Sequence, residues 1–301
     1  MADRWWTYQR ERFPLASFTA LSCVLAFSAL AFSALARGVH SLPDNWTLAA
    51  AAASALLLFA QMRVLDEFKD FEDDKRFRAY RAVPRGLVTL GELGWIGAAA
   101  AVAELALALS VDTRLAWLLA AVWACLALMA AEFFAPDWLK ARPLAYLVSH
   151  VPVAALITLY LTAFDWLPAG VAPRPALLPF AAVAVCATTL LEIGRKIRAP
   201  RDEEAGVVTY SAVWGRNTAV GAWLAALALT LAAGWLAANA IGFAAQFSVL
   251  GVLLATAALA VGLRFTHSPE TSFAQHLELL SGVATLALYL GLGPLALLLL
   301  I

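Results

Sequence analysis

The segment RVLDEFKDFEDDKR (residues 63–76) places six carboxylates and four basic side chains between two strongly apolar stretches. It stands out because the chain as a whole is 63% hydrophobic and only 14% charged. If the helix before the segment continues through it, steps of three and four residues bring several acids onto one face. These acids are Asp66, Asp70 and either Asp73 or Asp74, with Glu67 beside them. Carboxylates stacked in this way repel one another, so the spacing predicts a cation between them.

The rest of the chain consists of apolar runs that are long enough to cross a bilayer. About 20 apolar residues in a helix match the roughly 30 Å hydrocarbon core. In lipid the backbone must satisfy its own hydrogen bonds, and no alternating barrel pattern is present, so the runs are predicted to be helices. We therefore predict an all-α, multi-pass membrane protein, with nine transmembrane helices in a single domain over residues 1–301. The predicted spans are residues 14–36, 46–65, 92–111, 115–134, 143–164, 175–192, 217–240, 245–264 and 276–300.

The basic residues predict which end of each helix faces the cytoplasm. Of the 21 lysines and arginines, 18 lie in the N-terminal segment or in and beside the loops after the even-numbered spans. This asymmetry places the N-terminus in the cytoplasm and the C-terminus on the opposite side. The 21 acidic residues balance the basic ones, so no surplus positive charge indicates nucleic acid as a partner. The expected partner is the lipid bilayer.

Two cytoplasmic connections are long and highly charged, and they follow the second and sixth spans. They cover about residues 66–91 and 193–216. Hard divalent ions such as Mg²⁺ bind through one or two carboxylates together with substrate phosphates. Acids followed closely by arginines therefore predict a site for a metal ion and a diphosphate. The alternative for the first connection is a solvated acidic cap that neighbouring lysines and arginines neutralise.

The second connection mixes carboxylates and cations in the same way. Its acids are Glu192, Asp202, Glu203 and Glu204, and its basic residues are Arg195, Lys196, Arg198 and Arg201. Taken alone, it also fits an ordinary basic cytoplasmic loop. Because it lies on the same side of the membrane as the first connection, it is predicted to form the opposite wall of a cleft.

Both connections resemble the two Asp-rich motifs of the UbiA-type intramembrane prenyltransferase superfamily. The first motif of that family reads Asn-Asp-x-x-Asp-x-x-x-Asp, and its positions are occupied here by Asp66, Glu67, Asp70 and Asp74. The stretch after it resembles the family's Arg-Pro-x-x-x-Gly, with Arg81 and Gly86 matching and Ala82 replacing the proline.

The second motif matches only in part. The family places an Asp eight and four residues before a Gly and a Thr three residues after it. Asp202, Gly206 and Thr209 match, but Arg198 stands where the first Asp is expected. Either a neighbouring glutamate replaces the lost metal ligand, or Arg198 holds the diphosphate directly. The departure indicates a divergent branch of the superfamily.

The resemblance implies an enzyme that binds an isoprenyl diphosphate through Mg²⁺ and keeps the apolar tail in the bundle core. The metal ligands it implies are Asp66, Glu67, Asp70, Asp74, Glu192 and Asp202. The diphosphate-binding residues it implies are Arg63, Arg81, Arg85, Lys196 and Arg198. The predicted catalytic set comprises the four acids of the first motif with Asp202, Lys196 and Arg198. Prenyl transfer to a lipophilic, aromatic acceptor is the leading reaction, and a terpene cyclase that needs no acceptor is the alternative.

Polar side chains inside the predicted spans are further candidates, because charge is expensive in the membrane. They are Glu104, Glu132, His150, Tyr160 and Glu278. One of them is expected to be the base that removes a proton at the end of the reaction, with Glu104, His150 and Tyr160 as candidates. The alternative is a neutral side chain that hydrogen-bonds between helices. A transporter would also place charge in the membrane, but at mid-span, whereas most acids here lie at the cytoplasmic ends.

Overall fold

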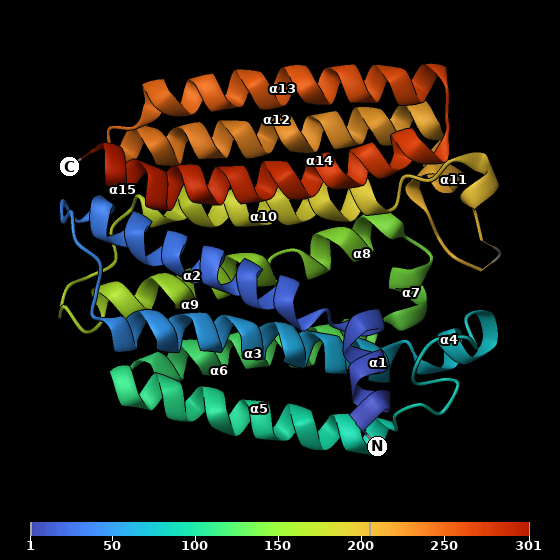
Figure 1. Ribbon diagram of the computed structural model, residues 1–301, viewed down its shortest axis with the longest axis horizontal. Helices are drawn as coiled ribbons and strands as arrows, with labels where there is room; N and C mark the ends of the chain where they lie inside the picture. The colour runs from blue at the N-terminus through green and yellow to red at the C-terminus, as the bar shows by residue number, and fades with distance from the viewer. Residues whose placement is uncertain (1, 205, 301) are drawn as a thin grey trace. The chain divides into compact units, whose positions relative to one another are not determined.

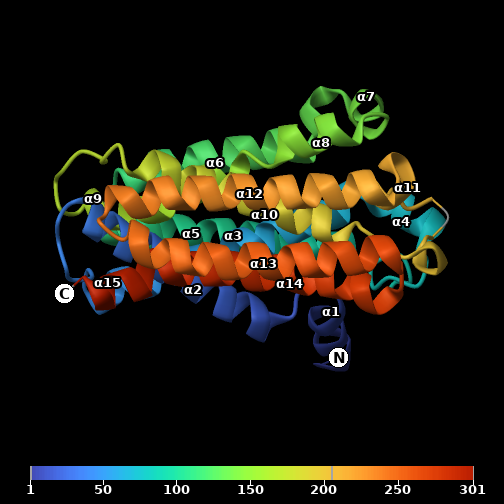
Figure 2. The same ribbon diagram turned by 90° about the horizontal axis from the view of Figure 1, so that it is seen from above.

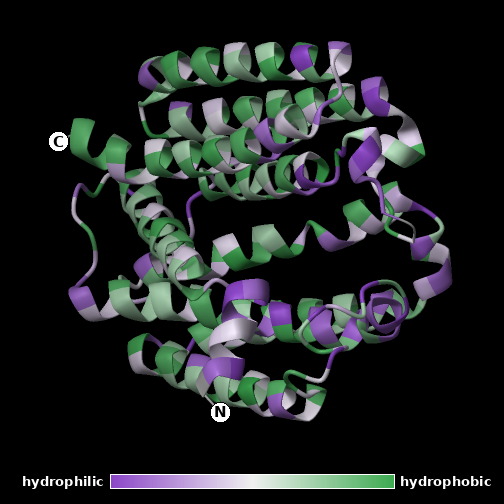
Figure 3. Cartoon of the chain, turned by 45° about the vertical axis from the view of Figure 1, so that its right-hand side comes forward, coloured by the Kyte–Doolittle hydropathy of each residue, from purple (hydrophilic) through white to green (hydrophobic). Residues whose placement is uncertain are grey.

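The computed structural model describes residues 2–204 and 206–300, and every regular element in these residues is a helix (Figure 1). Eight helical stretches are long and apolar enough to cross a membrane. They are Leu15–Ala36 (α2), Asn45–Lys69 (α3), Leu90–Val111 (α5), Pro143–Trp166 (α8 and α9), Leu177–Arg195 (α10), Arg216–Ala240 (α12), Ala244–His267 (α13) and Thr271–Leu299 (α14 to α15). Figure 3 shows these rods as mainly hydrophobic, with hydrophilic residues gathered at helix ends and connections. The prediction of an all-α, multi-pass membrane protein is confirmed.

The fourth predicted span corresponds to a shorter helix. α6 runs over Leu115–Ala130 and is apolar along its 16 residues. Each of the nine predicted spans therefore contains a helix, but eight of these stretches have the length of a full crossing within the described residues. The count of nine crossings stays a prediction.

The described residues form two compact units, and the first contains residues 2–30, 42–149 and 160–172. Its centre is α3, which packs against α5 and α6. The N-terminus of α3 is capped by Asp44, whose side chain accepts hydrogen bonds from the backbone N–H groups of Trp46 and Thr47. α5 begins with a capping box, in which Thr89 and Glu92 bond to each other's backbone N–H. These caps fix where the two apolar helices begin.

The second unit contains residues 31–41, 150–159, 173–204 and 206–300. Its four long helices α10, α12, α13 and α14 run alongside one another in both views (Figures 1 and 2). Phe180 of α10 stacks on Phe32 with ring centroids 4.3 Å apart and meets Tyr289 edge-on. Trp223 donates a hydrogen bond of 2.8 Å to Ser281, which satisfies both polar groups inside the apolar packing.

Helix interruptions in two places bear on the predictions. α8 (Pro143–His150) ends just before Pro152 and α9 begins at Val153, so the proline divides the predicted fifth span into two helices. The prediction that one helix continues through Asp74 is wrong. α3 ends at Lys69, Asp70 is its C-terminal cap, and a separate short helix, α4, covers Phe71–Phe77. The change of direction at Asp70 gives the acids of this segment different environments.

Candidate functional site

The first charged connection is a folded cap on the ends of α3 and α5. Its apolar side chains pack beneath it, with Val83 and Val88 buried against Val64 of α3 and Leu93 of α5. Tyr8 from α1 (Ala2–Arg12) joins the same cluster. α1 is therefore part of this cap, which brings N-terminal side chains to the acidic segment.

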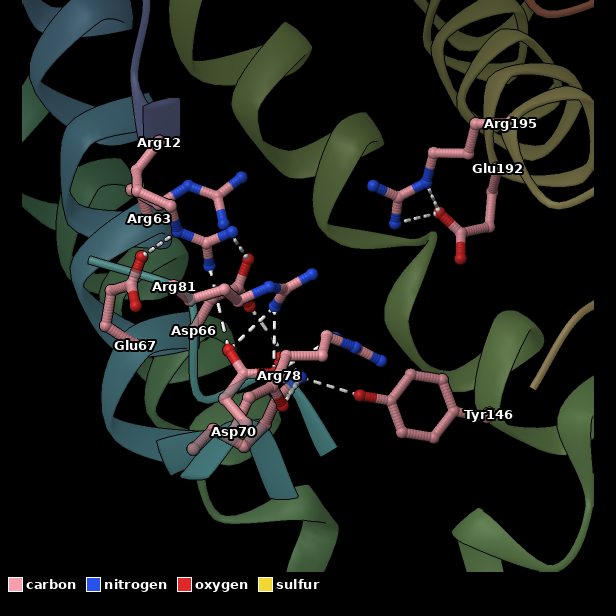
Figure 4. A network of polar contacts seen from close by, with 12 residues as sticks. Arg12, Arg63, Asp66, Glu67, Asp70, Arg78, Arg81, Tyr146, Glu192 and Arg195 are labelled. Atoms are coloured by element: carbon pink, nitrogen blue, oxygen red, sulfur yellow. Dashed lines mark hydrogen bonds and ion pairs between the residues drawn. The ribbon is translucent and has the colours of Figure 1, made fainter. Parts of the chain in front are cut away.

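The acids of the first cap divide into two pairs (Figure 4). Glu67 and Asp74 are buried, with side chains 1% and 3% exposed, whereas the side chains of Asp66 and Asp70 are 46% and 41% exposed. Each buried acid has a close arginine partner. The contacts are Arg12 Nε to Glu67 Oε1 at 2.6 Å, Arg81 Nη1 to Asp74 Oδ2 at 2.7 Å, and Arg78 Nη1 to Asp74 Oδ1 at 3.0 Å. The buried pair is therefore neutralised by the protein itself.

Among the residues that the structure describes, the exposed pair has no comparably close cation. Lys69 Nζ lies 3.7 Å from Asp66 and 3.9 Å from Asp70, and it donates a hydrogen bond of 2.6 Å to the hydroxyl of Tyr146. Burial of part of the group raises the pKa of the Asp70 carboxyl. Lys69 opposes this shift, and the charges of Asp66 and Asp74 add to it. An added cation would stabilise the charged Asp70 carboxylate and oppose this rise of its pKa.

The exposed pair fits a magnesium ion that is shared with a ligand. In the described part of the chain, no three His, Cys, Asp or Glu side chains are already grouped as a metal site. Mg²⁺ does not need such a group, because it commonly uses one or two carboxylates and completes its shell with phosphates and water. The Asp70 N–H donates to the Asp66 carbonyl at 2.9 Å, so the two residues are one helical turn apart.

The cations predicted to bind diphosphate in the first cap have different surroundings. Arg81 is bound to Asp74, and Arg85 pairs with Glu11 at 2.8 Å and also donates to the Tyr80 carbonyl. Arg63 lies 3.8 Å from Asp66, and its Nε has no hydrogen-bond partner within the described residues. Of these three arginines, Arg63 has the fewest close contacts.

Three further residues of the cap do not belong to the predicted set. Besides Arg12 and Tyr146, Lys140 at the end of α7 (Pro136–Lys140) lies 2.9 Å from Asp73. The distribution of basic residues already assigned Arg12 and Lys140 to the cytoplasmic side. Nothing in the local spacing connected them to acids that lie 55 and 67 residues away in the sequence.

Two of the four carboxylates of the second cap, Glu192 and Glu203, have close partners of their own. Glu192 binds Lys196 at 2.8 Å and Arg195 on its other oxygen (Figure 4). Glu203 accepts hydrogen bonds from Thr209 and Ser211 at the start of α11 (Tyr210–Trp214). These contacts give both glutamates a structural role in the turn.

The two remaining motif residues of the second cap are more open. Asp202 accepts a hydrogen bond from Thr271 and keeps 30% of its side chain exposed. Arg198 is 41% exposed, and its guanidinium lies 3.9 Å from Glu278, a distance at which the pair is loose. Arg198 is thus able to take an anionic ligand without breaking a close contact.

The polar residues inside the spans lie in distinct settings. Glu104 is fully buried, and Tyr160 is buried with its hydroxyl 3.4 Å from Ser54. His150 is the last residue of α8. Glu132 is buried in a turn of three consecutive residues with positive φ (45°, 51° and 59°), a conformation that costs about 1–2 kcal/mol per residue outside glycine. Glu278 is 49% exposed, so it is not a buried intramembrane acid.

Solved structures share this fold. A UbiA homolog from Aeropyrum pernix K1 superimposes with a TM-score of 0.68 at 18% identity, covering 89% of this chain and 96% of that one. A digeranylgeranylglyceryl phosphate synthase gives 0.62 at 14% identity, covering 96% and 99%. A UbiA homolog from Archaeoglobus fulgidus bound to GPP and Mg²⁺ gives 0.55 at 14% identity, covering 95% and 98%. At these identities the likeness establishes the fold alone.

Sequence comparison adds the family. A search among curated proteins gave no match. The model of the UbiA prenyltransferase family, in contrast, matches residues 24–281, which include both charged connections and most of the helices. The chain therefore belongs to the UbiA prenyltransferase family.

Proposed function

We propose that this protein is a Mg²⁺-dependent intramembrane enzyme that ionises an isoprenyl diphosphate and transfers the prenyl group to a lipophilic, aromatic acceptor. The observation that carries the proposal is the division of the first cap. Within the described residues, Asp66 and Asp70 remain half-exposed and have no cation closer than 3.7 Å, while every other motif acid of this cap is neutralised by arginine. Family membership and the Archaeoglobus homologs bound to GPP or DMAPP with Mg²⁺ support this assignment.

Asp66 and Asp70 would hold the ion, which would neutralise the charge that develops on the leaving diphosphate. Arg63 and Lys69 lie beside these carboxylates and add positive charge where the phosphate oxygens would lie. Glu67 and Asp74 would act indirectly, by fixing the arginines and the fold of the cap. The contributions of Asp202, Lys196 and Arg198 to the same diphosphate stay predictions.

The chemistry begins when the bond between the first prenyl carbon and the diphosphate oxygen breaks and its electron pair leaves with diphosphate. The allylic cation then forms a new C–C bond with an electron-rich carbon of the acceptor, and a proton is lost. Water must be kept from the cation, and the apolar interior of the helices serves this purpose. We expect the caps to face the cytoplasm, as the distribution of basic residues predicts.

A second candidate shares the ionisation step. In a terpene cyclase the cation is attacked by a double bond of its own chain, and no acceptor is needed. Arg198, which replaces an expected Asp of the second motif, favours this candidate because it marks a divergence from the usual diphosphate site.

Purified protein in lipid nanodiscs tests the proposal. It is incubated with Mg²⁺ and C10, C15 or C20 prenyl diphosphates, with and without an aromatic acceptor, and both diphosphate release and organic products are measured. A prenylated acceptor that depends on Mg²⁺ supports the transferase. A cyclic hydrocarbon or alcohol formed without acceptor identifies the cyclase. The absence of Mg²⁺-dependent diphosphate release with all three substrates would refute the enzyme assignment.

A further inference from the structure

A polar cluster is buried among the helices of the first unit, away from the acidic cap. Glu104 of α5 is completely buried, and its Oε2 accepts hydrogen bonds from Gln61 Nε2 of α3 at 2.7 Å and from Trp123 Nε1 of α6 at 3.1 Å. Ser54, two turns before Gln61 on α3, contacts the hydroxyl of Tyr160. Four helices thus contribute polar groups to one apolar region.

One carboxyl oxygen of Glu104 lacks a hydrogen bond within the described residues of this cluster. Its Oε1 has no hydrogen-bond partner, and no ion pair reaches the carboxyl, within residues 2–204 and 206–300. The indole N–H of Trp123 can only donate a hydrogen bond. Its contact with Glu104 therefore favours the ionised carboxylate. A buried carboxyl oxygen without a partner costs about 1–3 kcal/mol, so its presence requires an explanation, and a catalytic role is one of those that apply.

The position of the cluster relative to the exposed acids follows from the helix that carries both. Gln61 precedes Asp66 by five residues and Asp70 by nine on α3 and its cap. At 1.5 Å per residue, Gln61 lies about 8–14 Å along the helix from Asp66 and Asp70, toward the middle of the apolar span, and Glu104 is hydrogen-bonded to it. A diphosphate and the first carbons of its prenyl chain fill a separation of this size. The unpaired oxygen therefore lies at the depth where new carbon–carbon bonds would form.

We propose that Glu104 is the proton acceptor that ends the reaction. This inference rests on the proposed function, because it requires a carbocation formed from a prenyl diphosphate. After the new C–C bond forms, the C–H bond next to the cationic carbon breaks. Its electron pair forms the C=C bond of the product, or restores the aromatic ring, and the proton goes to Glu104 Oε1. Gln61 and Trp123 are positioning residues that orient the carboxylate, and the proton returns to solvent before the next turnover.

The test compares Glu104→Gln with wild-type protein by measuring diphosphate release and organic product in parallel. Glutamine has nearly the same shape and still accepts a hydrogen bond, but it cannot take a proton. We expect diphosphate release within about threefold of wild type and a loss of the deprotonated product of about 10²–10⁴-fold, the usual share of a general base. Water then captures the cation that remains after C–C bond formation, or the prenyl cation that is released when this bond reverts, so an alcohol accumulates in place of the deprotonated product. Wild-type amounts of the normal product would overturn the inference.

Two further variants decide the question even if Glu104→Gln does not fold. Trp123→Phe keeps an aromatic ring and removes one donor to Glu104, so alcohol is expected to form at the expense of product. An unchanged ratio of alcohol to normal product in this variant counts against Glu104.

Tyr160→Phe removes the competing acid–base group and is expected to leave the product unchanged. A shift from product to alcohol in this variant would show that Tyr160 is the proton acceptor. Glu270→Gln, at an exposed glutamate directly before α14, serves as the control.

These outcomes are distinct from a failure of the proposed function. If the protein does not use prenyl diphosphates, the wild type itself releases no diphosphate. If only the role of Glu104 is wrong, the wild type and Glu104→Gln release diphosphate and make the same product.

Discussion

Arg12 donates a hydrogen bond of 2.6 Å from its Nε to Oε1 of Glu67, joining two residues that lie 55 positions apart in the sequence. The same guanidinium lies 4.0 Å from Asp74. The N-terminal helix α1 thus supplies a positive charge to two of the four acids of the first motif. Together with Arg81 and Arg78, which bind Asp74 more closely, Arg12 neutralises these two buried carboxylates, while Asp66 and Asp70 stay accessible.

Arg12→Ala is expected to destabilise the cap strongly. Glu67 is 1% exposed, and removal of its arginine leaves a buried carboxylate without a counter-ion, which costs about 3–5 kcal/mol. Arg85→Ala removes the exposed pair with Glu11 and should cost about 0–1 kcal/mol. Thermal unfolding of both variants in the same detergent measures the difference. Equal melting temperatures would show that the Arg12 contact does not hold the cap together.

Asp70→Asn and Glu67→Gln are expected to separate metal binding from structure. Asp70→Asn removes a half-exposed carboxylate with no close partner, so the fold should survive while Mg²⁺-dependent diphosphate release falls by about 100-fold or more. Glu67→Gln should lower the melting temperature and change the Mg²⁺ concentration for half-maximal activity by less than about threefold. The measurement is a Mg²⁺ titration of diphosphate release. If both variants raise the Mg²⁺ concentration for half-maximal activity equally, Glu67 is a metal ligand as well.

The contrast between the buried Glu67 and the half-exposed Asp70 shows which features of the site could be predicted from the sequence. The length of each apolar run correctly predicted a helix in every span, and the spacing of the acids located the first cap. Both signals are local in the sequence. The break at Asp70 has no local signal, since no Pro or Gly occurs between residues 63 and 76. The burial of Glu67 depends on Arg12, and the environment of Asp73 depends on Lys140, and both contacts are long-range. Sequence spacing predicted which residues gather, but not which of them the protein itself neutralises.

Gly194→Ala is expected to disrupt the packing of the second unit. A methyl group on Gly194 of α10 would lie 2.2 Å from the hydroxyl oxygen of Ser281 and 3.2 Å from Nε1 of Trp223. These two side chains bond to each other, so the clash would push apart a buried hydrogen bond and cost about 1–3 kcal/mol. Gly221→Ala on α12 is the control, because its added methyl meets nothing within 4 Å and alanine favours the helix. In thermal unfolding, the melting temperature of Gly194→Ala should lie below that of the wild type, and that of Gly221→Ala should equal or exceed it.

Arg198→Ala is expected to weaken binding of the prenyl diphosphate without changing the need for Mg²⁺. The guanidinium is 41% exposed and only loosely paired with Glu278, so it is available to the phosphate oxygens. Loss of a hydrogen bond to a charged group costs about 1.5–3 kcal/mol, which corresponds to a rise in KM of roughly 10–100-fold. Arg201→Ala provides the control, because Arg201 is 72% exposed in the same turn and donates to Thr271. Steady-state kinetics at several Mg²⁺ concentrations measure both the KM for the prenyl diphosphate and the Mg²⁺ dependence.

If Arg198→Ala and Arg201→Ala raise KM equally, the effect reflects the overall charge of the loop. If Arg198→Ala instead shifts the Mg²⁺ dependence, Arg198 acts on the metal ligands and does not hold the diphosphate directly.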